Sequence, residues 1–518
     1  MGSLRTETVP LLSADMASPR TSKDMAVNDT KVDASVSVSS EVDAVEEAFA
    51  KKVLRKIDWR LLPILFITFN FNFIDKTILS SASVFGLSKD THLVGDQYSW
   101  VSSLFYFGYF FWEYPTTILI QKLPIGKYIA ADIICWGAIV ASTAACKNYG
   151  GLITVRFFTG VVEATISPAF LYVTAMWYTR DEMPSRMGMW YAGNSFGGAV
   201  ASVLSYAIGH IDNVLSPWQW LYIIFGVATS IWGIIVLIFM PDTIATAKFL
   251  TEDERHCANE RVAKRGAGVT MSIKNEWNFE QVKECLIDPK TWFFFSISLL
   301  TQMPNGGTQS FANLVLKGFG FSSLESTLVG LPASFISFSC ILITGWLASR
   351  YRNITTILIS TIIIPPVIGA ALMNWASQNG VKLFGYYLLG FAHGAIPLTM
   401  SLIGSNTKGI TKKMTMTAIM FIAFCSGNIA GPQLFKKAEA PHYPTAFKAI
   451  LICYALASLA SLGLRFYLIW VNKRRDLAEG TETYGTGTAA AAFPGATVSD
   501  VDYEDITDYN TIGFRYRL

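Results

Sequence analysis

Long apolar runs constrain this chain more than any other feature of its sequence. Each run has about 20 residues, the length of an α-helix that crosses a lipid bilayer, and we find twelve of them between residues 61 and 470. Backbone groups in hydrocarbon must find partners within the segment, so each run is predicted to be a helix. The predicted spans are 61–82, 98–120, 128–146, 152–175, 187–209, 218–240, 290–312, 325–348, 354–374, 382–404, 414–434 and 446–470.

The twelve runs form two groups of six with a charged stretch between them. With 52% apolar and only 15% charged residues, the chain is too apolar for a soluble protein of 518 residues. We therefore predict an all-α membrane protein built from two six-helix halves. The predicted segments are a disordered cytosolic tail (1–55), an N-terminal half (56–240), a cytosolic linker (241–289), a C-terminal half (290–471) and a cytosolic tail (472–518). An amphipathic helix in the linker is one interpretation, and a plain solvated linker is the alternative.

Lys and Arg residues gather at alternate ends of the spans. Five of them precede the first span between residues 51 and 60, and three close the twelfth at 473–475. The loop after the eleventh span, with Lys436 and Lys437, is an exception. Because positive residues favour the cytosolic side of a membrane, both termini and the linker are predicted to be cytosolic.

Residues that carry enzyme chemistry are scarce. The seven cysteines form no Cys-x-x-Cys pair, and among the five histidines only His393 lies deep in a predicted span. We therefore expect neither an enzyme nor a metal site nor a cofactor. Two six-helix halves joined by a linker are typical of secondary transporters, with a receptor as the competing class. The expected partners are a small-molecule substrate and the lipid bilayer, with no nucleic acid, and we expect a monomer.

A polar stripe runs along the first span and contains two adjacent charges. Asn72 and Lys76 share a helix face because they lie four residues apart, and Asp75 lies three residues beyond Asn72. Charged groups inside a membrane are costly and usually face a bundle interior or a water-filled cavity. Lys76 and Asn72 are therefore candidates for substrate binding. The alternative is a structural ion pair that locks two helices together.

Carboxylates in the first half are candidates for proton coupling. Arg156 and Glu163 fall on one face of the fourth span, and Glu113 lies in the second span. A carboxylate in a low-dielectric cavity takes up a proton more readily, as a group that accepts and releases protons during transport must do. We therefore name Glu163, Arg156, Asp75 and Glu113 as the proton-coupling candidates.

The second half contributes uncharged polar residues. Gln302, Asn305 and Gln309 share a face of the seventh span, where Pro304 and nearby glycines predict a break in the helix. These amides are substrate-binding candidates, or alternatively they join helices by hydrogen bonds. His393 is a further candidate, the alternative being an interior histidine with satisfied hydrogen bonds.

Nearly the whole chain beyond residue 55 resembles a known family. The stretches that carry the resemblance include "NFIDKTILSSASVFGL", "RFFTGVVEA", "MWYTRDEMPSR", "GSNTKGITKKMTMTAIMFIAFCSGNIAGPQLF" and the tail "YEDITDYNTIGFRYRL". In this order they resemble fungal major facilitator superfamily transporters of the anion:cation symporter branch, which includes the allantoate permease. At Lys76 the branch more usually has Arg.

The resemblance implies a major facilitator fold, proton coupling and small organic anions, vitamins or ureide-like nutrients as cargo. It places Arg156 of "RFFTG" in proton coupling. It also leaves two alternatives open: a transporter serving a fungal secondary-metabolite pathway, and a nutrient sensor that does not transport. The expected location is the plasma membrane, with the vacuolar membrane as the alternative.

Overall fold

The computed structural model describes residues 22–179, 182–211, 214–264, 278–479, 506–511 and 513–518. These residues form helices joined by short turns, and none of them lies in a β-strand. The chain divides into two compact units, residues 1–56 and residues 57–518. The cavity and the buried ion-pair networks described below belong to the second unit.

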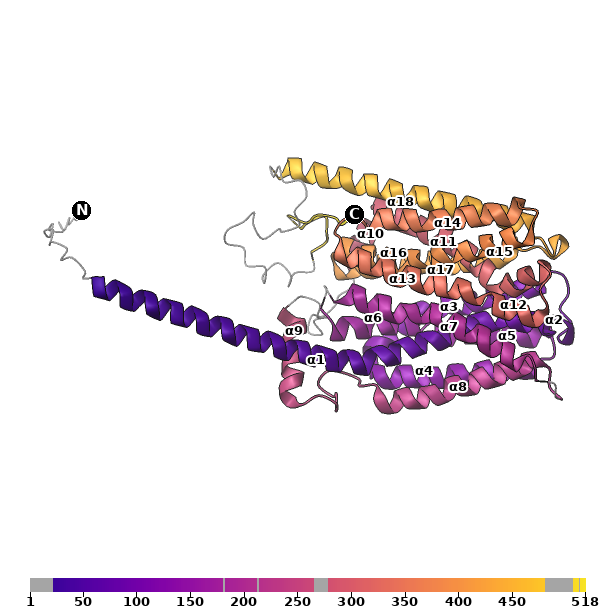
Figure 1. The fold of residues 1–518 in the computed structure, drawn as a ribbon, viewed down its shortest axis with the longest axis horizontal. Helices are drawn as coiled ribbons and strands as arrows, with labels where there is room; N and C mark the ends of the chain where they lie inside the picture. The colour runs from indigo at the N-terminus through magenta and orange to yellow at the C-terminus, as the bar shows by residue number, and fades with distance from the viewer. Residues whose placement is uncertain (1–21, 180–181, 212–213, 265–277, 480–505, 512) are drawn as a thin grey trace, which may run out of the picture. The chain divides into compact units, whose positions relative to one another are not determined.

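The helices of the second unit fall into two sets (Figure 1). The first set contains the remainder of α1 (Ser22–Val84), α2 (Leu87–Asp90), α3 (Gln97–Lys122), α4 (Ile125–Ser142), α5 (Tyr149–Glu163), α6 (Ile166–Trp177), α7 (Met183–Ile208) and α8 (Pro217–Phe239). The second set contains α11 (Pro289–Gly318), α12 (Ser323–Val329), α13 (Leu331–Arg350), α14 (Thr355–Trp375), α15 (Asn379–Leu388), η2 (Leu389–Gly394), α16 (Ala395–Asn406), α17 (Ile410–Ala430), η3 (Gly431–Leu434), η4 (Lys437–Glu439) and α18 (Pro444–Ala478). The linker contributes α9 (Glu252–Lys264) and α10 (Phe279–Ile287).

Each of the twelve predicted spans coincides with a long helix or with consecutive helical segments. Among the described residues, nine helical stretches are both long and apolar enough to cross a membrane. The other three expected spans are α3, α7 and α11, which have 26, 26 and 30 residues and are long enough. They are less apolar because they carry polar residues that face the interior of the bundle.

The first unit differs from the predicted disordered tail. Helix α1 begins at Ser22, so residues 22–55 are helical, and residues 1–21 lie outside the described residues. On this helix Glu47 and Lys51 lie four residues apart and form a 2.8 Å ion pair at the surface. Such pairs support a helix that composition alone does not predict.

The predicted break in the seventh span is wrong, because α11 is a continuous helix that contains Pro304. The glycines serve close packing instead. A Cβ at Gly306 would lie 2.8 Å from the Cα of Asn428, and one at Gly307 would lie 2.9 Å from the carbonyl oxygen of Gly431. Only glycine permits the backbones of α11 and α17 to approach this closely.

Within the second unit the helices run between two ends, which we name for reference. The linker end is the end where α11 begins and α18 ends, beside α10 and α9; the opposite end carries α2 and α12 (Figure 1). The predicted amphipathic linker helix corresponds to α9, with α10 as a second helix, and residues 265–277 lie outside the described residues.

Hydrogen bonds between uncharged groups join the two halves near the opposite end. The hydroxyl of Tyr98 donates to the carbonyl oxygen of Ser310 at 2.8 Å, and the hydroxyls of Ser102 and Ser310 also hydrogen-bond. The backbone N–H of Asn313 donates to Ser80 Oγ at 3.0 Å. All five residues are buried. The halves are therefore closed against each other at this end.

Candidate functional site

A cavity lies between the two halves, at mid-length of the helices that line it. It includes about 580 Å³ that protein atoms do not fill, part of it continuous with solvent. One side is lined by α1, α3 and α7, and the other by α11, α13, η2, α16, α17 and α18. Its polar side chains are Lys76, Asn194, Ser195, Thr301, Gln302, Asn305, Gln309 and His393, and its aromatic ones are Phe73, Tyr106, Tyr191, Phe424 and Tyr454.

Lys76 is the cation in the wall of this cavity. Its Nζ lies 2.6 Å from Oε1 of Glu163, which belongs to α5. The amide of Asn72 bridges the pair: its Nδ2 donates to Glu163 Oε1 at 2.7 Å, and its Oδ1 accepts from Lys76 Nζ at 2.9 Å. The side chain of Lys76 is 15% exposed, whereas that of Glu163 is fully buried. The ammonium therefore stands between the carboxylate and the cavity.

One oxygen of this carboxylate is free. Glu163 Oε2 is buried and has no hydrogen-bond partner among the described residues. A buried carboxylate with an unpartnered oxygen is poorly solvated, and a proton on that oxygen would remove the cost of the buried charge. Glu163 can thus exist as the partner of Lys76 or as a neutral acid.

Asp75 finds a different partner from its neighbour Lys76. Its Oδ2 lies 3.9 Å from Nη1 of Arg156, and both side chains are almost fully buried. Arg156 Nη2 also donates to the hydroxyl of Tyr222, on α8, at 2.6 Å. The pair lies behind the cavity wall, since neither charge lines the cavity. It connects α1, α5 and α8 inside the first half.

The amides predicted in the seventh span come together as expected on one face of α11. Asn305 Nδ2 donates to Gln302 Oε1 at 3.2 Å and to Oδ1 of Asn428, on α17, at 3.3 Å. Gln309 Oε1 accepts from the hydroxyl of Tyr106 at 3.5 Å, while its Nε2 is buried without a partner among the described residues. These amides therefore join helices and line the cavity at the same time.

His393 also lines the cavity and is partly satisfied. Its Nδ1 lies 3.2 Å from both the hydroxyl of Ser337 and the carbonyl oxygen of Gly390. The imidazole ring lies edge-on to the ring of Phe73, which belongs to the first half. His393 is thus held by its own helix region and lines the cavity, and its role in substrate binding stays a prediction.

Glu113 is the candidate that the structure keeps apart from the others. It lies on α3 with its Oε2 buried and unpartnered among the described residues, but it does not line the cavity. The other three proton-coupling candidates lie together: Asp75 pairs with Arg156, and Glu163 pairs with the substrate-binding candidate Lys76.

Several cavity residues were not predicted from the sequence. Asn194 of α7 lines the cavity, and Asn428 of α17 hydrogen-bonds to the cavity residue Gln302; both are amides inside apolar runs, so their polarity was a usable signal. No such signal marked the aromatic cavity residues Tyr106, Phe424 and Tyr454, because aromatic residues occur throughout the spans. The fold alone brings these rings to the cavity.

Comparisons with known proteins agree on the family. Residues 65–432 match the sequence model of the Major Facilitator Superfamily. An uncharacterized transporter of Schizosaccharomyces pombe is 34% identical over 495 residues, which cover 94% of each chain. The allantoate permease of Saccharomyces cerevisiae is 30% identical over 507 residues, covering 94% of this chain and 90% of the permease.

A solved structure shares the fold. A bacterial homologue of the human lysosomal transporter Spinster, in an inward-facing and occupied conformation, superposes with a TM-score of 0.57 and 13% sequence identity. The match covers 79% of this chain and 96% of that one. The predicted fold class, an all-α membrane protein with the major facilitator fold, is confirmed.

Proposed function

Because the chain belongs to the Major Facilitator Superfamily, in the fungal branch that includes the allantoate permease, we propose that it moves a small organic anion together with a proton. In this proposal Lys76 binds the anion and Glu163 carries the proton. Members of this family are membrane transporters, so the chain is an integral membrane transporter and not an enzyme.

One observation carries the proposal: the ammonium of Lys76 lies between the buried carboxylate of Glu163 and the cavity. A carboxylate of the cargo and the carboxylate of Glu163 would compete for this one ammonium. Both cannot be ionised beside it without repulsion at short range in a low-dielectric site. Binding of the anion therefore favours the protonated form of Glu163.

Proton and anion then move as a linked pair. When a proton binds the free Oε2 of Glu163, the attraction between Glu163 and Lys76 weakens, and the cargo carboxylate takes the place of the lost negative charge. When the anion leaves, the proton leaves too, because Lys76 again favours the ionised carboxylate. The net charge around Lys76 is the same in both states, which avoids an uncompensated buried charge.

Asp75 and Arg156 have a supporting role in this scheme. They compensate each other behind the cavity, and Arg156 is also held by Tyr222. The attraction across this 3.9 Å pair, in which neither oxygen of Asp75 accepts a hydrogen bond from the described residues, helps to hold α1 beside α5, so that Lys76 faces Glu163. The alternative stated for the first span, an ion pair that locks two helices, therefore fits Asp75 with Arg156 better than it fits Lys76.

The other half supplies uncharged contacts for the rest of the cargo. Gln302, Asn305, Gln309 and His393 offer donors and acceptors opposite Lys76, and the aromatic rings offer flat apolar surfaces. A small anion with further polar groups would bridge the two halves. One chain provides the whole cavity, so we propose that the monomer transports.

We further propose that the linker end is cytosolic and that the plasma membrane is the location. Basic residues between 51 and 60, ahead of the first apolar run, and at the end of α18 support the orientation. With hydrogen bonds closing the opposite end, the structure then corresponds to a state closed to the outside. A protease-accessible tag at either terminus should be protected in intact cells, and cleavage there would contradict the orientation.

Uptake into proteoliposomes tests the function. We expect accumulation of a radiolabelled carboxylate driven by a pH gradient, with allantoate as the first probe and a panel of small carboxylates after it. In the variant Glu163→Gln, exchange of labelled for unlabelled anion should persist, because Lys76 remains available, while accumulation driven by protons is lost. Binding without flux under any gradient would instead support the nutrient sensor and contradict transport.

A further inference from the structure

The last residues of the chain are folded against the linker end of the second half. Residues 506–511 and 513–518 contact helix ends that lie far apart in the sequence: α10, α11, α14, α16, α17 and α18. Residues 480–505, which connect this segment to α18, lie outside the described residues. We call residues 506–518 the C-terminal strap.

Asp508 is the centre of the docked strap. One of its oxygens, Oδ2, lies 2.6 Å from Nζ of Lys290 and accepts from the hydroxyl of Tyr516 at 2.6 Å. The other, Oδ1, lies 2.7 Å from Nζ of Lys412. Asp508, Lys290 and Lys412 are all buried, with at most 1% of each side chain exposed. The strap thus inserts a carboxylate between lysines at the start of α11 and of α17.

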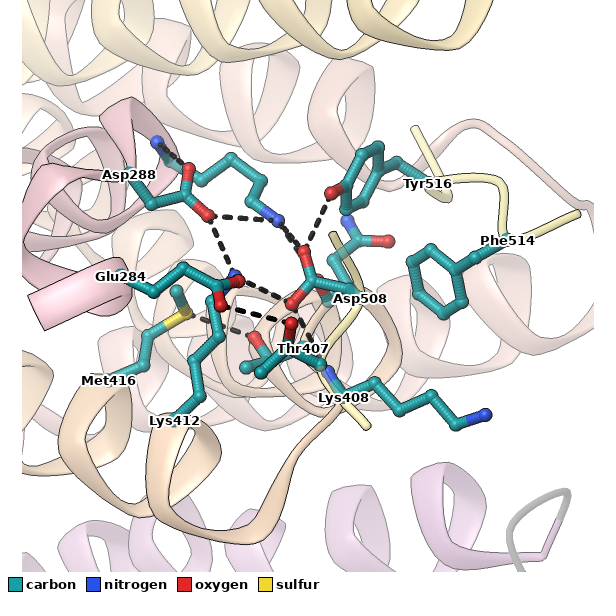
Figure 2. A network of polar contacts seen from close by, with 12 residues as sticks. Glu284, Asp288, Thr407, Lys408, Lys412, Met416, Asp508, Phe514 and Tyr516 are labelled. Carbon is teal, nitrogen blue, oxygen red and sulfur yellow. Dashed lines mark hydrogen bonds and ion pairs between the residues drawn. The ribbon is translucent and has the colours of Figure 1, made fainter. Parts of the chain in front are cut away.

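Two further carboxylates complete this buried cluster (Figure 2). Oδ2 of Asp288 lies 3.2 Å from both lysine ammonium groups, and Oε1 of Glu284 lies 2.8 Å from Lys412 Nζ. Lys290 also lies over the ring of Tyr516, 3.8 Å from its centroid. Without the strap the two lysines would lose their closest anion and keep only Asp288 and Glu284, so their buried ammonium groups would be less well compensated.

A second set of contacts fixes the backbone of the strap. The N–H of Tyr516 donates to Asn472 Oδ1 at 2.9 Å on α18. The N–H of Arg517 donates to Asn406 Oδ1 at 2.7 Å on α16, and the amide of Asn406 returns a 2.8 Å bond to the Arg517 carbonyl oxygen. At the start of α14, the N–H of Thr355 donates to the carbonyl oxygen of Leu518. Hydrogen bonds at successive residues indicate a specific docking site rather than loose contact.

We propose that the C-terminal strap is an internal ligand that ties the linker ends of α11, α14, α16, α17 and α18 together, with Asp508 as its positioning residue, so that the second half moves as one rigid body. Alternating access works by moving two halves against each other around a central site. Helix ends that moved independently would lose the cavity geometry formed by α11, α16 and α17. The strap acts on this geometry without touching the cavity.

Hydrogen–deuterium exchange of the purified full-length chain tests whether the strap is docked. We expect the backbone amides of residues 513–518 to exchange roughly 100-fold or more slowly than those of the free peptide. The protection should be the same with and without the carboxylate probe allantoate. Exchange at the rate of the free peptide would overturn the proposal, whether or not the chain transports.

Distances between spin labels test whether the strap coordinates the helix ends. Labels at Ile357→Cys, on α14, and Met414→Cys, on α17, sit at exposed positions. Cys135, Cys146 and Cys257 are replaced by Ser, since the other four cysteines are buried. We expect one narrow distance distribution with the strap docked. Pulsed electron paramagnetic resonance measures this distance distribution in detergent, independently of any transport.

Variants of the strap then separate coordination from mere stability. Asp508→Asn should broaden this distribution and accelerate exchange at the linker ends of α16 and α17. Asp476→Asn is the matched control: Asp476 also pairs with the strap, through Arg515, but the pair is partly exposed and contributes little. Unchanged distances and exchange in Asp508→Asn would overturn the proposal.

A milder variant covers the case in which Asp508→Asn fails to fold. Tyr516→Phe removes only the hydroxyl, which donates to Asp508 and accepts from Arg475 Nη2 at 3.3 Å, and keeps the buried ring. We expect several-fold faster exchange of residues 513–518 with normal yield and cavity. Wild-type exchange in this variant would contradict the role assigned to Asp508 and Tyr516.

Discussion

Lys76 and Glu163 form an ion pair of 2.6 Å, although 87 residues (163 − 76) separate them in the sequence, and only the lysine is exposed to the central cavity. The adjacent Asp75 pairs instead with Arg156. The two adjacent charged residues of this span therefore have different roles. Asp75 belongs to the interior of the first half, and Lys76 belongs to the cavity.

Lys76→Gln should weaken binding of a carboxylate by roughly ten- to a hundredfold, the usual effect of losing a hydrogen bond to a charged group. A neutral amide analogue of the same molecule should lose much less. Equilibrium binding to purified protein measures both. Lys76→Arg keeps the positive charge but replaces the ammonium by the wider guanidinium, so it should retain part of the affinity.

A double variant checks that the effect is not simply misfolding. Lys76→Gln alone leaves the fully buried Glu163 without its cation, which destabilises the fold. Adding Glu163→Gln removes the unpaired charge and should restore the yield. If the double variant binds the carboxylate as tightly as wild type, Lys76 is a helix clamp and not the anion site.

Removing one partner of the Asp75–Arg156 pair should reduce stability more than it changes substrate preference. Asp75→Asn leaves a buried guanidinium without its carboxylate, and the cost is about 3–5 kcal/mol. We expect a clear fall in the thermal unfolding temperature, measured by fluorescence. A variant of normal stability that no longer discriminates between carboxylates would contradict the structural role.

The closed opposite end can be locked by a disulfide. The hydroxyls of Ser102 and Ser310 are in contact, so Ser102→Cys with Ser310→Cys should form a bridge that stops transport until a reductant is added. Ser103→Cys with Ser310→Cys is the control, because the hydroxyl of Ser103 instead donates to the carbonyl oxygen of Ile429. Full transport with the first bridge formed would show that this end need not open.

Docking of the strap should depend on pH through Asp508. Burial alone would raise the pKa of Asp508, but the nearby ammonium groups of Lys290 and Lys412 outweigh burial and hold the pKa below its usual value. A lowered pKa stabilises docking fully above the unfolded value of about 3.9, and the stabilisation is lost as the pH falls through the folded value. Exchange protection of the strap should be constant from about pH 5 to 8 and disappear only in stronger acid. Loss of protection near neutral pH would show that another group controls docking.

Span lengths and helix faces were predictable from the sequence because they depend on local pattern. The twelve spans follow from the length of the apolar runs, and the shared face of Gln302, Asn305 and Gln309 follows from helical periodicity; the structure confirms both. The sequence also indicated that Asp75 and Lys76 need different partners, since they point in different directions on a helix. These inferences use spacing within one helix.

Tertiary pairing was not predictable in the same way. Which carboxylate meets Lys76 depends on how α1 packs against α5, and the tie between Asp508 and Lys290 spans 218 residues. Glycines beside a proline can either break a helix or allow close packing, and the sequence does not distinguish the two. The structure shows close packing in the seventh span. The ending "TDYNTIGFRYRL" carries no apolar periodicity, so its docking could not be inferred from pattern.

Counting protons during anion binding tests the central claim most directly. Titration calorimetry of the purified protein with allantoate, or the best carboxylate of the panel, is repeated near neutral pH in two buffers with different ionisation enthalpies. The account predicts uptake of about one proton per bound anion in the wild type and about none in Glu163→Gln, which still binds. No proton uptake by the wild type, or equal uptake by the variant, would contradict exchange of Glu163 for the cargo carboxylate at Lys76.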